Sequence, residues 1–180
     1  MRQENPKREP GWGFSHGLRV ANCALALAKE VSLPVNEDIV YIGALCHDIG
    51  RGHNPHNERG AQVTAQILQD HCTPEELRCI CHIVLHHIHR TLDNLTAELK
   101  LVQDADLLDK FGKIIVWRAV YFCGRQHQEF SDLMAYVHHE YRLKLVKKLH
   151  FEQSKKIYTE RRRFENEFFG ELERLYIEGI

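Results

Sequence analysis

Apolar residues recur three and four positions apart along most of this chain, and that spacing limits the fold to packed α-helices. Over residues 14–31 the repeat places one apolar stripe on a helix, formed by Leu18, Val20, Ala21, Cys23, Leu25, Leu27, Ala28 and Val31. The same spacing predicts helices over residues 36–49, 57–69, 73–89, 96–111, 114–123, 131–149 and 154–176. No segment shows the period-two alternation that predicts a strand. The sequence therefore predicts an all-α helical bundle.

Residues that favour helix ends support these boundaries. Asn36 is suited to cap the second helix, because it precedes two acidic residues in the first turn. Thr73 and Glu76 have the spacing of a capping box, with Pro74 in the first turn between them. Thr96 is placed to cap the following helix. Independent local signals thus agree with the apolar repeat.

Length and charge define the class of protein. A chain of 180 residues suffices for one domain, which we place at residues 13–180, after an irregular N-terminal arm over residues 1–12 that contains Pro6 and Pro10. The formal net charge of −1 argues against nucleic acid as a partner. The basic run at residues 161–163 is flanked by Glu160 and Glu165, which favours a solvated helix face. A homo-oligomer is compatible with this composition.

The apolar segments are short. Uninterrupted runs such as residues 119–123 fall far below the roughly 20 residues that a membrane-spanning helix needs. The charged N-terminal residues do not resemble a signal peptide. We therefore expect a cytoplasmic protein, with its six cysteines reduced and mostly buried as small apolar side chains.

Histidine and aspartate residues interrupt the apolar helix faces. The chain has 13 histidines, and several are adjacent to an aspartate or to each other. His47 and Asp48 end a long apolar run, and a buried carboxylate needs a cation or hydrogen bonds to offset its lost hydration. The same pattern recurs on other predicted helices, at His16, His86, His87, Asp104 and Asp106. Side chains that converge from several helices are the usual way in which bundles build metal sites.

A mixed set of imidazole and carboxylate ligands selects the class of metal. It suits Mn²⁺, Fe²⁺, Co²⁺, Ni²⁺ or Zn²⁺ at roughly 2.0–2.2 Å, and it suits Ca²⁺ or a thiolate-bound zinc poorly. Cys79, Cys81 and His82 imitate a zinc motif, but Cys81 falls on the apolar stripe of its helix, so core packing explains it better. The sequence thus predicts a divalent cation held by histidine and aspartate.

The order of these residues resembles the HD superfamily of metal-dependent phosphohydrolases. His16 lies in SHGLRV, the pair His47 and Asp48 lies in ALCHDIGR, and Asp106 lies in ADLL. The C-terminal segment, residues 158–164, also resembles small single-domain bacterial and archaeal members. The resemblance implies an HD-type fold and one or two metal ions per chain, Mg²⁺ included, held by His16, His47, Asp48 and Asp106. It further implies that a metal-bound water hydrolyses a phosphoester or phosphoanhydride of a nucleotide or other small phosphate.

Some members of that family bind a second metal. The corresponding candidates in this chain are His56, His86 and His87, which otherwise face substrate. His53 competes with His56, but it lacks the glycine that follows His56 four residues later. These histidines are therefore candidates for a second metal or for the substrate.

Other polar residues are candidates for supporting roles. Asp48 is expected to share a face with the catalytic water, and Arg51 or Arg19 could bind a phosphate oxygen. Asp104 and Asp106 lie about 200° apart around one helix, so they cannot both face one metal. The helical periodicity does not show which of the two faces the metal. The resemblance selects Asp106 and leaves Asp104 as an ion-pair partner or alternative ligand.

Two other functions fit the same residues. An HD-type di-iron oxygenase would need the second metal site to be complete. A metal-binding regulatory module would keep the site without turnover. His138 and His139 match no part of the family pattern, and we expect them to be exposed.

Overall fold

The computed structural model describes residues 13–138 and 144–179, so the predicted N-terminal arm lies outside the described residues. These residues contain no β-strand, only an isolated bridge between Arg51 and His53. The all-α prediction is confirmed. The chain divides into two compact units, residues 1–106 and 107–180, which are described in turn. A single domain over residues 13–180 remains a prediction.

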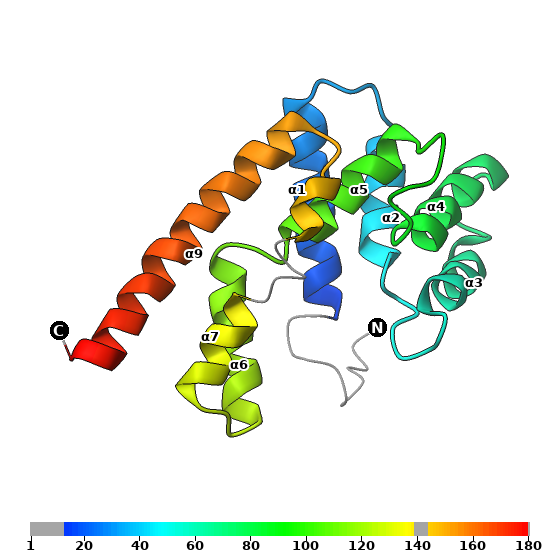
Figure 1. The fold of residues 1–180 in the computed structure, drawn as a ribbon. Helices are drawn as coiled ribbons and strands as arrows, with labels where there is room; N and C mark the ends of the chain where they lie inside the picture. Colours follow the sequence, from blue (N-terminus) through cyan, green and yellow to red (C-terminus); the bar gives the residue numbers. More distant parts are fainter. Residues whose placement is uncertain (1–12, 139–143, 180) are drawn as a thin grey trace. The chain divides into compact units, whose positions relative to one another are not determined.

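The first two helices pack against each other in the first unit (Figure 1). Helix α1 spans Phe14–Glu30 and α2 spans Glu37–Cys46. The buried face of α1 includes four residues of the predicted stripe, Val20, Ala21, Leu27 and Ala28, and also Ala24, which the prediction did not include. The other members of the stripe are partly buried. Gly17 lets the helices approach closely, because a Cβ atom there would lie 2.6 Å from the carbonyl oxygen of Leu45. The backbone of α1 thus lies directly against the end of α2.

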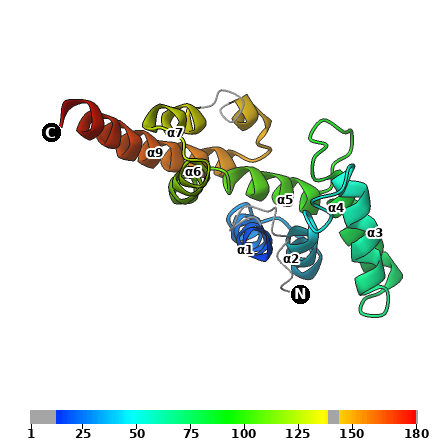
Figure 2. The same cartoon turned by 90° about the horizontal axis from the view of Figure 1, so that it is seen from below.

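Helices α3 (His56–Leu68) and α4 (Pro74–His86) form a second pair, and α4 also packs on α2 (Figures 1 and 2). The predicted caps are present. The Asn36 side chain accepts hydrogen bonds from the first turn of α2, and Thr73 and Glu76 form the capping box of α4. Helix α4 ends at His86, three residues earlier than predicted.

Helix α5 spans Ala97–Leu108 and begins after Thr96, whose hydroxyl accepts a hydrogen bond from the Leu99 amide. It is shorter than the predicted 96–111. Within the first unit its buried apolar residues are Leu99, Leu101, Val102 and Ala105. Gln103 and Asp104 are just as buried, so this part of α5 carries polar groups into the interior.

The second unit contains α6 (Lys113–Arg125), α7 (Phe130–Val137), the short 3-10 helix η1 (Leu145–Lys148) and α9 (Glu152–Glu178) (Figure 2). Its core is formed by Ile115, Ala119, Met134, Val137 and Phe169. The single helix predicted over residues 131–149 is wrong, because α7 ends at Val137 and the backbone leaves helical geometry at His138. His138 is exposed as expected, and His139 lies outside the described residues.

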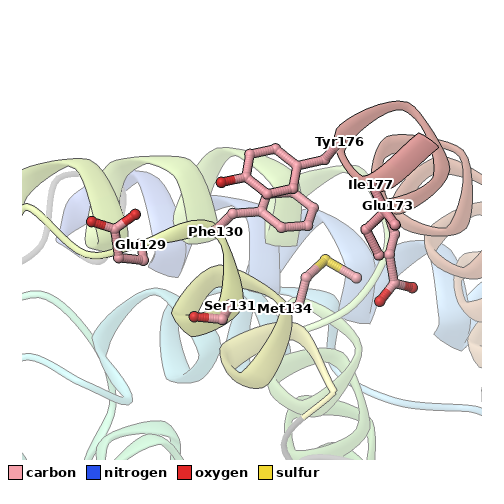
Figure 3. A pocket seen from close by; sticks show the side chains of 7 residues that line it. All are labelled: Glu129, Phe130, Ser131, Met134, Glu173, Tyr176 and Ile177. Carbon is pink, nitrogen blue, oxygen red and sulfur yellow. The ribbon is translucent and has the colours of Figure 1, made fainter. Parts of the chain in front are cut away.

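A shallow hollow lies within the second unit, between α7 and the end of α9 (Figure 3). The rings of Phe130 and Tyr176 stack there with centroids 4.0 Å apart. Met134 and Ile177 complete its apolar lining, and none of the predicted metal ligands borders it. In the described part of the chain, no helix combines the length and apolar character that crossing a bilayer requires.

The turn between α2 and α3 depends on Gly50. A Cβ atom at this position would collide with the carbonyl oxygen of His56 and with the backbone nitrogen of Gly60. This close approach holds the segment after α2 against the start of α3. Only glycine leaves room for it.

We expect Gly50→Ala to lower the free energy of unfolding by about 1–3 kcal/mol, the usual cost of forcing an extra group into a packed site. Gly124→Ala is the matched control, because nothing lies within 4 Å of a Cβ atom there and alanine favours the helix. Urea unfolding followed by circular dichroism measures both. Equal stability of Gly50→Ala and the unaltered protein would contradict this account of the turn.

Candidate metal centre

Four of the predicted ligands converge in the first unit. His16 comes from the first turn of α1, His47 and Asp48 from the turn after α2, and Asp106 from the last turn of α5. The Nε2 atom of His16 lies 3.3 Å from Asp106 Oδ1 and 3.9 Å from Asp48 Oδ2. Donors that share one metal at roughly 2.1 Å lie about 3 Å apart. The four side chains are therefore close to the spacing of a common ion.

The imidazole of His47 is oriented by its own helix. Its Nδ1 atom donates a hydrogen bond of 2.6 Å to the carbonyl oxygen of Ala44, which leaves the lone pair of the neutral ring on Nε2. Burial lowers the pKa of His47 to about 4, so the ring is neutral at pH 7. Nε2 has no hydrogen-bond partner among the described residues, and it lies 3.8 Å from oxygens of both Asp48 and Asp106. Three groups with lone pairs, His47 Nε2 and the oxygens of Asp48 and Asp106, thus lie close together.

Asp48 remains ionised despite its burial. Burial would raise the pKa of this carboxyl, but a hydrogen bond with His87 and the charge of Arg51 bring the pKa well below its usual range. The Nε atom of Arg51 donates to Asp48 Oδ2 at 2.8 Å. The same oxygen faces His16 and His47. The site therefore carries a buried negative charge.

The other oxygen of Asp48 faces a second group of histidines. Asp48 Oδ1 lies 3.6 Å from His56 Nε2 and 3.5 Å from His87 Nε2, and the two imidazole nitrogens are 3.4 Å apart. The Nδ1 atom of His87 donates to the Val84 carbonyl, as His47 does to Ala44. Asp48 thus belongs to two ligand trios, the first trio with His16 and His47 and the second trio with His56 and His87.

Not every candidate histidine enters this cluster. The ring of His86 packs instead against His82 and His89, with centroids 4.5 and 5.9 Å away. His53 is exposed in the turn after Gly50. Adjacent residues on a helix lie about 100° apart, which is why His86 and His87 point in different directions.

The two aspartates of α5 have different surroundings. Asp106 faces His16 and His47, whereas Asp104 is fully buried with Oδ1 3.6 Å from Arg90 Nη1. Arg19 lies one turn after His16 on α1 and is partly exposed. Arg51 has half of its side chain exposed. The roles of Asp104, Arg19 and Arg51 in binding remain predictions.

Two polar residues near the site, the buried Gln103 and the partly buried Arg90, were not identified from the sequence. Gln103 donates through Nε2 to the carbonyl oxygens of His86 and His89, each at 3.0 Å. Arg90 donates to the Gln103 carbonyl. For Gln103, the available signal was a polar residue within the apolar run of α5, the same signal that identified the aspartates.

Relatives of known sequence match part of the chain. Bifunctional uridylyltransferase/uridylyl-removing enzyme of Acinetobacter baumannii is 34% identical over 115 residues, which are 63% of this chain and 12% of that protein. The enzyme of the same name from Legionella pneumophila is 32% identical over 90 residues, 49% of this chain and 10% of that protein. The chain spans about a tenth of the length of these curated relatives.

Solved structures match most of the chain. Bacillus subtilis YpgQ in complex with ADP has a TM-score of 0.69 and 24% identity, covering 88% of this chain and 84% of that one. A predicted HD superfamily hydrolase from an uncultured Thermotogales bacterium has a TM-score of 0.68 and 20% identity, covering 96% of this chain and 86% of that one. At these identities the likeness shows a shared fold.

The family model of the HD domain matches residues 13–110. This range is more than half of the chain and includes both ligand trios and Asp106. The chain belongs to the HD domain family.

Proposed function

We propose that this protein is a metal-dependent phosphohydrolase that acts on a nucleotide or another small phosphate. The observation that carries the proposal is the convergence of His16, His47, Asp48 and Asp106, with donor atoms 3.3–3.9 Å apart. These four residues are the proposed ligands of a divalent cation.

The chemistry of the donors fits a cation. A neutral His47 can only accept through Nε2, and an ionised Asp48 can only accept, so no hydrogen bond between these two groups offsets their repulsion. A divalent ion between them would do so. The backbone hydrogen bond from His47 Nδ1 fixes the ring in the tautomer that a metal requires.

A bound metal would supply a Lewis acid for the phosphate oxygen and an acidified water molecule. The chain itself supplies orientation and charge. Asp48 is held in place by the bond from Arg51 Nε, while half of the Arg51 side chain is open to solvent. Its guanidinium is therefore able to bind a phosphate oxygen without releasing the carboxylate. Arg19 is a second candidate for this contact.

A second metal is proposed at the second trio. Asp48 presents Oδ1 to His56 and His87 and Oδ2 to His16 and His47, so this carboxylate could bridge two cations. His87 is oriented through its Nδ1 bond in the same way as His47. His86 is not part of this second site.

The substrate class rests on the relatives. YpgQ was solved with ADP, and the matched enzymes from Acinetobacter and Legionella are named for removing uridylyl groups, which are nucleotidyl groups attached through phosphate. A nucleotide is therefore the first substrate to test.

Elemental analysis of the purified protein, followed by a phosphate-release screen over nucleotides with Mn²⁺, Co²⁺, Ni²⁺ and Mg²⁺, tests the proposal. Two iron atoms per chain with oxygen consumption and no phosphate release would favour a di-iron oxygenase instead. Bound metal without any turnover would favour a regulatory module.

We expect His47→Ala and Asp48→Asn to lose bound metal and to lower turnover at least about a thousandfold, because each removes a ligand from a shared ion. The helical circular dichroism signal should persist, since both residues follow the end of α2. His53→Ala, in the exposed turn nearby, is the control and should keep full metal content. Wild-type activity in either ligand variant would overturn the proposed site.

Substitutions of the two aspartates of α5 should have different effects in the same assay. Asp106→Asn should lose most of its metal affinity, because it removes a negative ligand. Asp104→Asn should retain metal but unfold about 2 kcal/mol more easily, because Arg90 loses a charged partner in the interior. Metal titration and urea unfolding measure the two effects. The reverse ranking would reassign the ligand to Asp104.

The second trio has its own prediction. His56→Ala and His87→Ala should each lower the metal content from two ions per chain to one. His86→Ala is the matched control, because it removes an adjacent histidine that faces His82 and His89. One ion per chain before and after all three substitutions would show that the site is mononuclear.

A further inference from the structure

Gln103 is a buried polar residue that the proposed reaction does not use. Its side chain is fully enclosed, and its amide group donates to the carbonyl oxygen of His86, the last residue of α4, and to that of His89, three residues later. The His86 carbonyl also accepts the His89 amide at 2.9 Å, so Gln103 adds a second donor to this turn. Gln103 therefore caps the turn that follows α4 from a different helix.

The capped segment includes His87. This residue lies between the two carbonyls that Gln103 binds, at the first position after α4. Its Nδ1 atom is fixed by Val84, and its Nε2 atom faces Asp48. The direction of the His87 ring thus depends on the backbone that Gln103 holds.

Gln103 also shares a side of α5 with Asp106. Residues three apart are neighbours on a helix surface, so one turn of α5 carries both the clamp on His87 and the ligand that faces His16. Arg90 braces this turn by donating to the Gln103 carbonyl while its charge lies beside Asp104. Helix α5 thereby links His87 of the second trio to Asp106, which faces the first trio.

We propose that Gln103 is a positioning residue. It fixes the position of His87 in the second trio relative to Asp106, which faces His16 and His47 of the first trio. The proposal rests on the proposed metal centre, since both histidine and aspartate act there as ligands. A merely structural cap would stabilise α4 and leave metal affinity unchanged.

The experiment uses Co²⁺ alone, titrated into the chelator-treated full chain and followed by calorimetry and by the visible absorption of bound Co²⁺. Gln103→Met keeps the volume and removes both amide donors. Gln103→Asn keeps the donors on a side chain one methylene shorter, which cannot reach both carbonyls, and it decides the question if the methionine variant does not fold. Thr73→Ala is the matched control, because it removes the cap at the other end of α4.

We expect both Gln103 variants to bind Co²⁺ at least tenfold more weakly at one step of the titration, with an altered visible spectrum, while Thr73→Ala binds as the unaltered protein does. The loss should not add to that of His87→Ala, because both act on the same ligand. Unchanged Co²⁺ binding in the Gln103 variants would overturn the proposal, as would an equal loss in Thr73→Ala. A failure of the unaltered protein to bind Co²⁺ would instead reject the metal centre itself.

Discussion

The buried carboxylate of Asp48 is the interaction on which this site depends. An ionised group without solvent costs several kcal/mol unless other charges and hydrogen bonds compensate for its lost hydration. Here the compensation comes from the hydrogen bond with His87 and from Arg51, which donates to Oδ2. The close approaches at Gly17 and Gly50 bring the surrounding backbones near enough to supply it. Helix packing and site chemistry are thus set by the same contacts.

Local signals predicted the helices well where the stabilising groups are also local. Helix α1 spans Phe14–Glu30 against the predicted 14–31, α2 begins directly after its predicted cap Asn36, and the capping box of α4 involves residues three apart. The errors arise where groups distant in the sequence determine where a helix ends. The predicted helix continues to residue 89, but α4 ends at His86, and Gln103 of another helix binds the carbonyls of His86 and His89 in the turn that follows. The periodicity after Ser131 continues beyond His138, although α7 ends at Val137 and His138 itself is not helical.

The candidate site, like the helices, could be predicted only as far as local signals reach. His16, His47, Asp48 and Asp106 could be identified as candidates because each places a polar side chain of the type that binds metals on an apolar helix face, in the order of the family pattern. Periodicity could not distinguish Asp106 from Asp104, since both sides of α5 are apolar. The distinction lies in the tertiary surroundings, where Arg90 faces one and histidines face the other. No local rule identifies such a partner 14 residues away.

Exposure shows from which side a ligand can reach the centre. The side chains of His16, His47 and His87 are almost entirely buried, whereas Asp106 is 13% exposed, His56 is 22% exposed and Arg51 is 51% exposed. Solvent therefore reaches the cluster past the turn that carries Arg51 and the start of α3. A phosphate entering there would meet the guanidinium before it reached Asp48. The same turn that holds Asp48 near the start of α3 through Gly50 thus also places the positive charge of Arg51 at this exposed side.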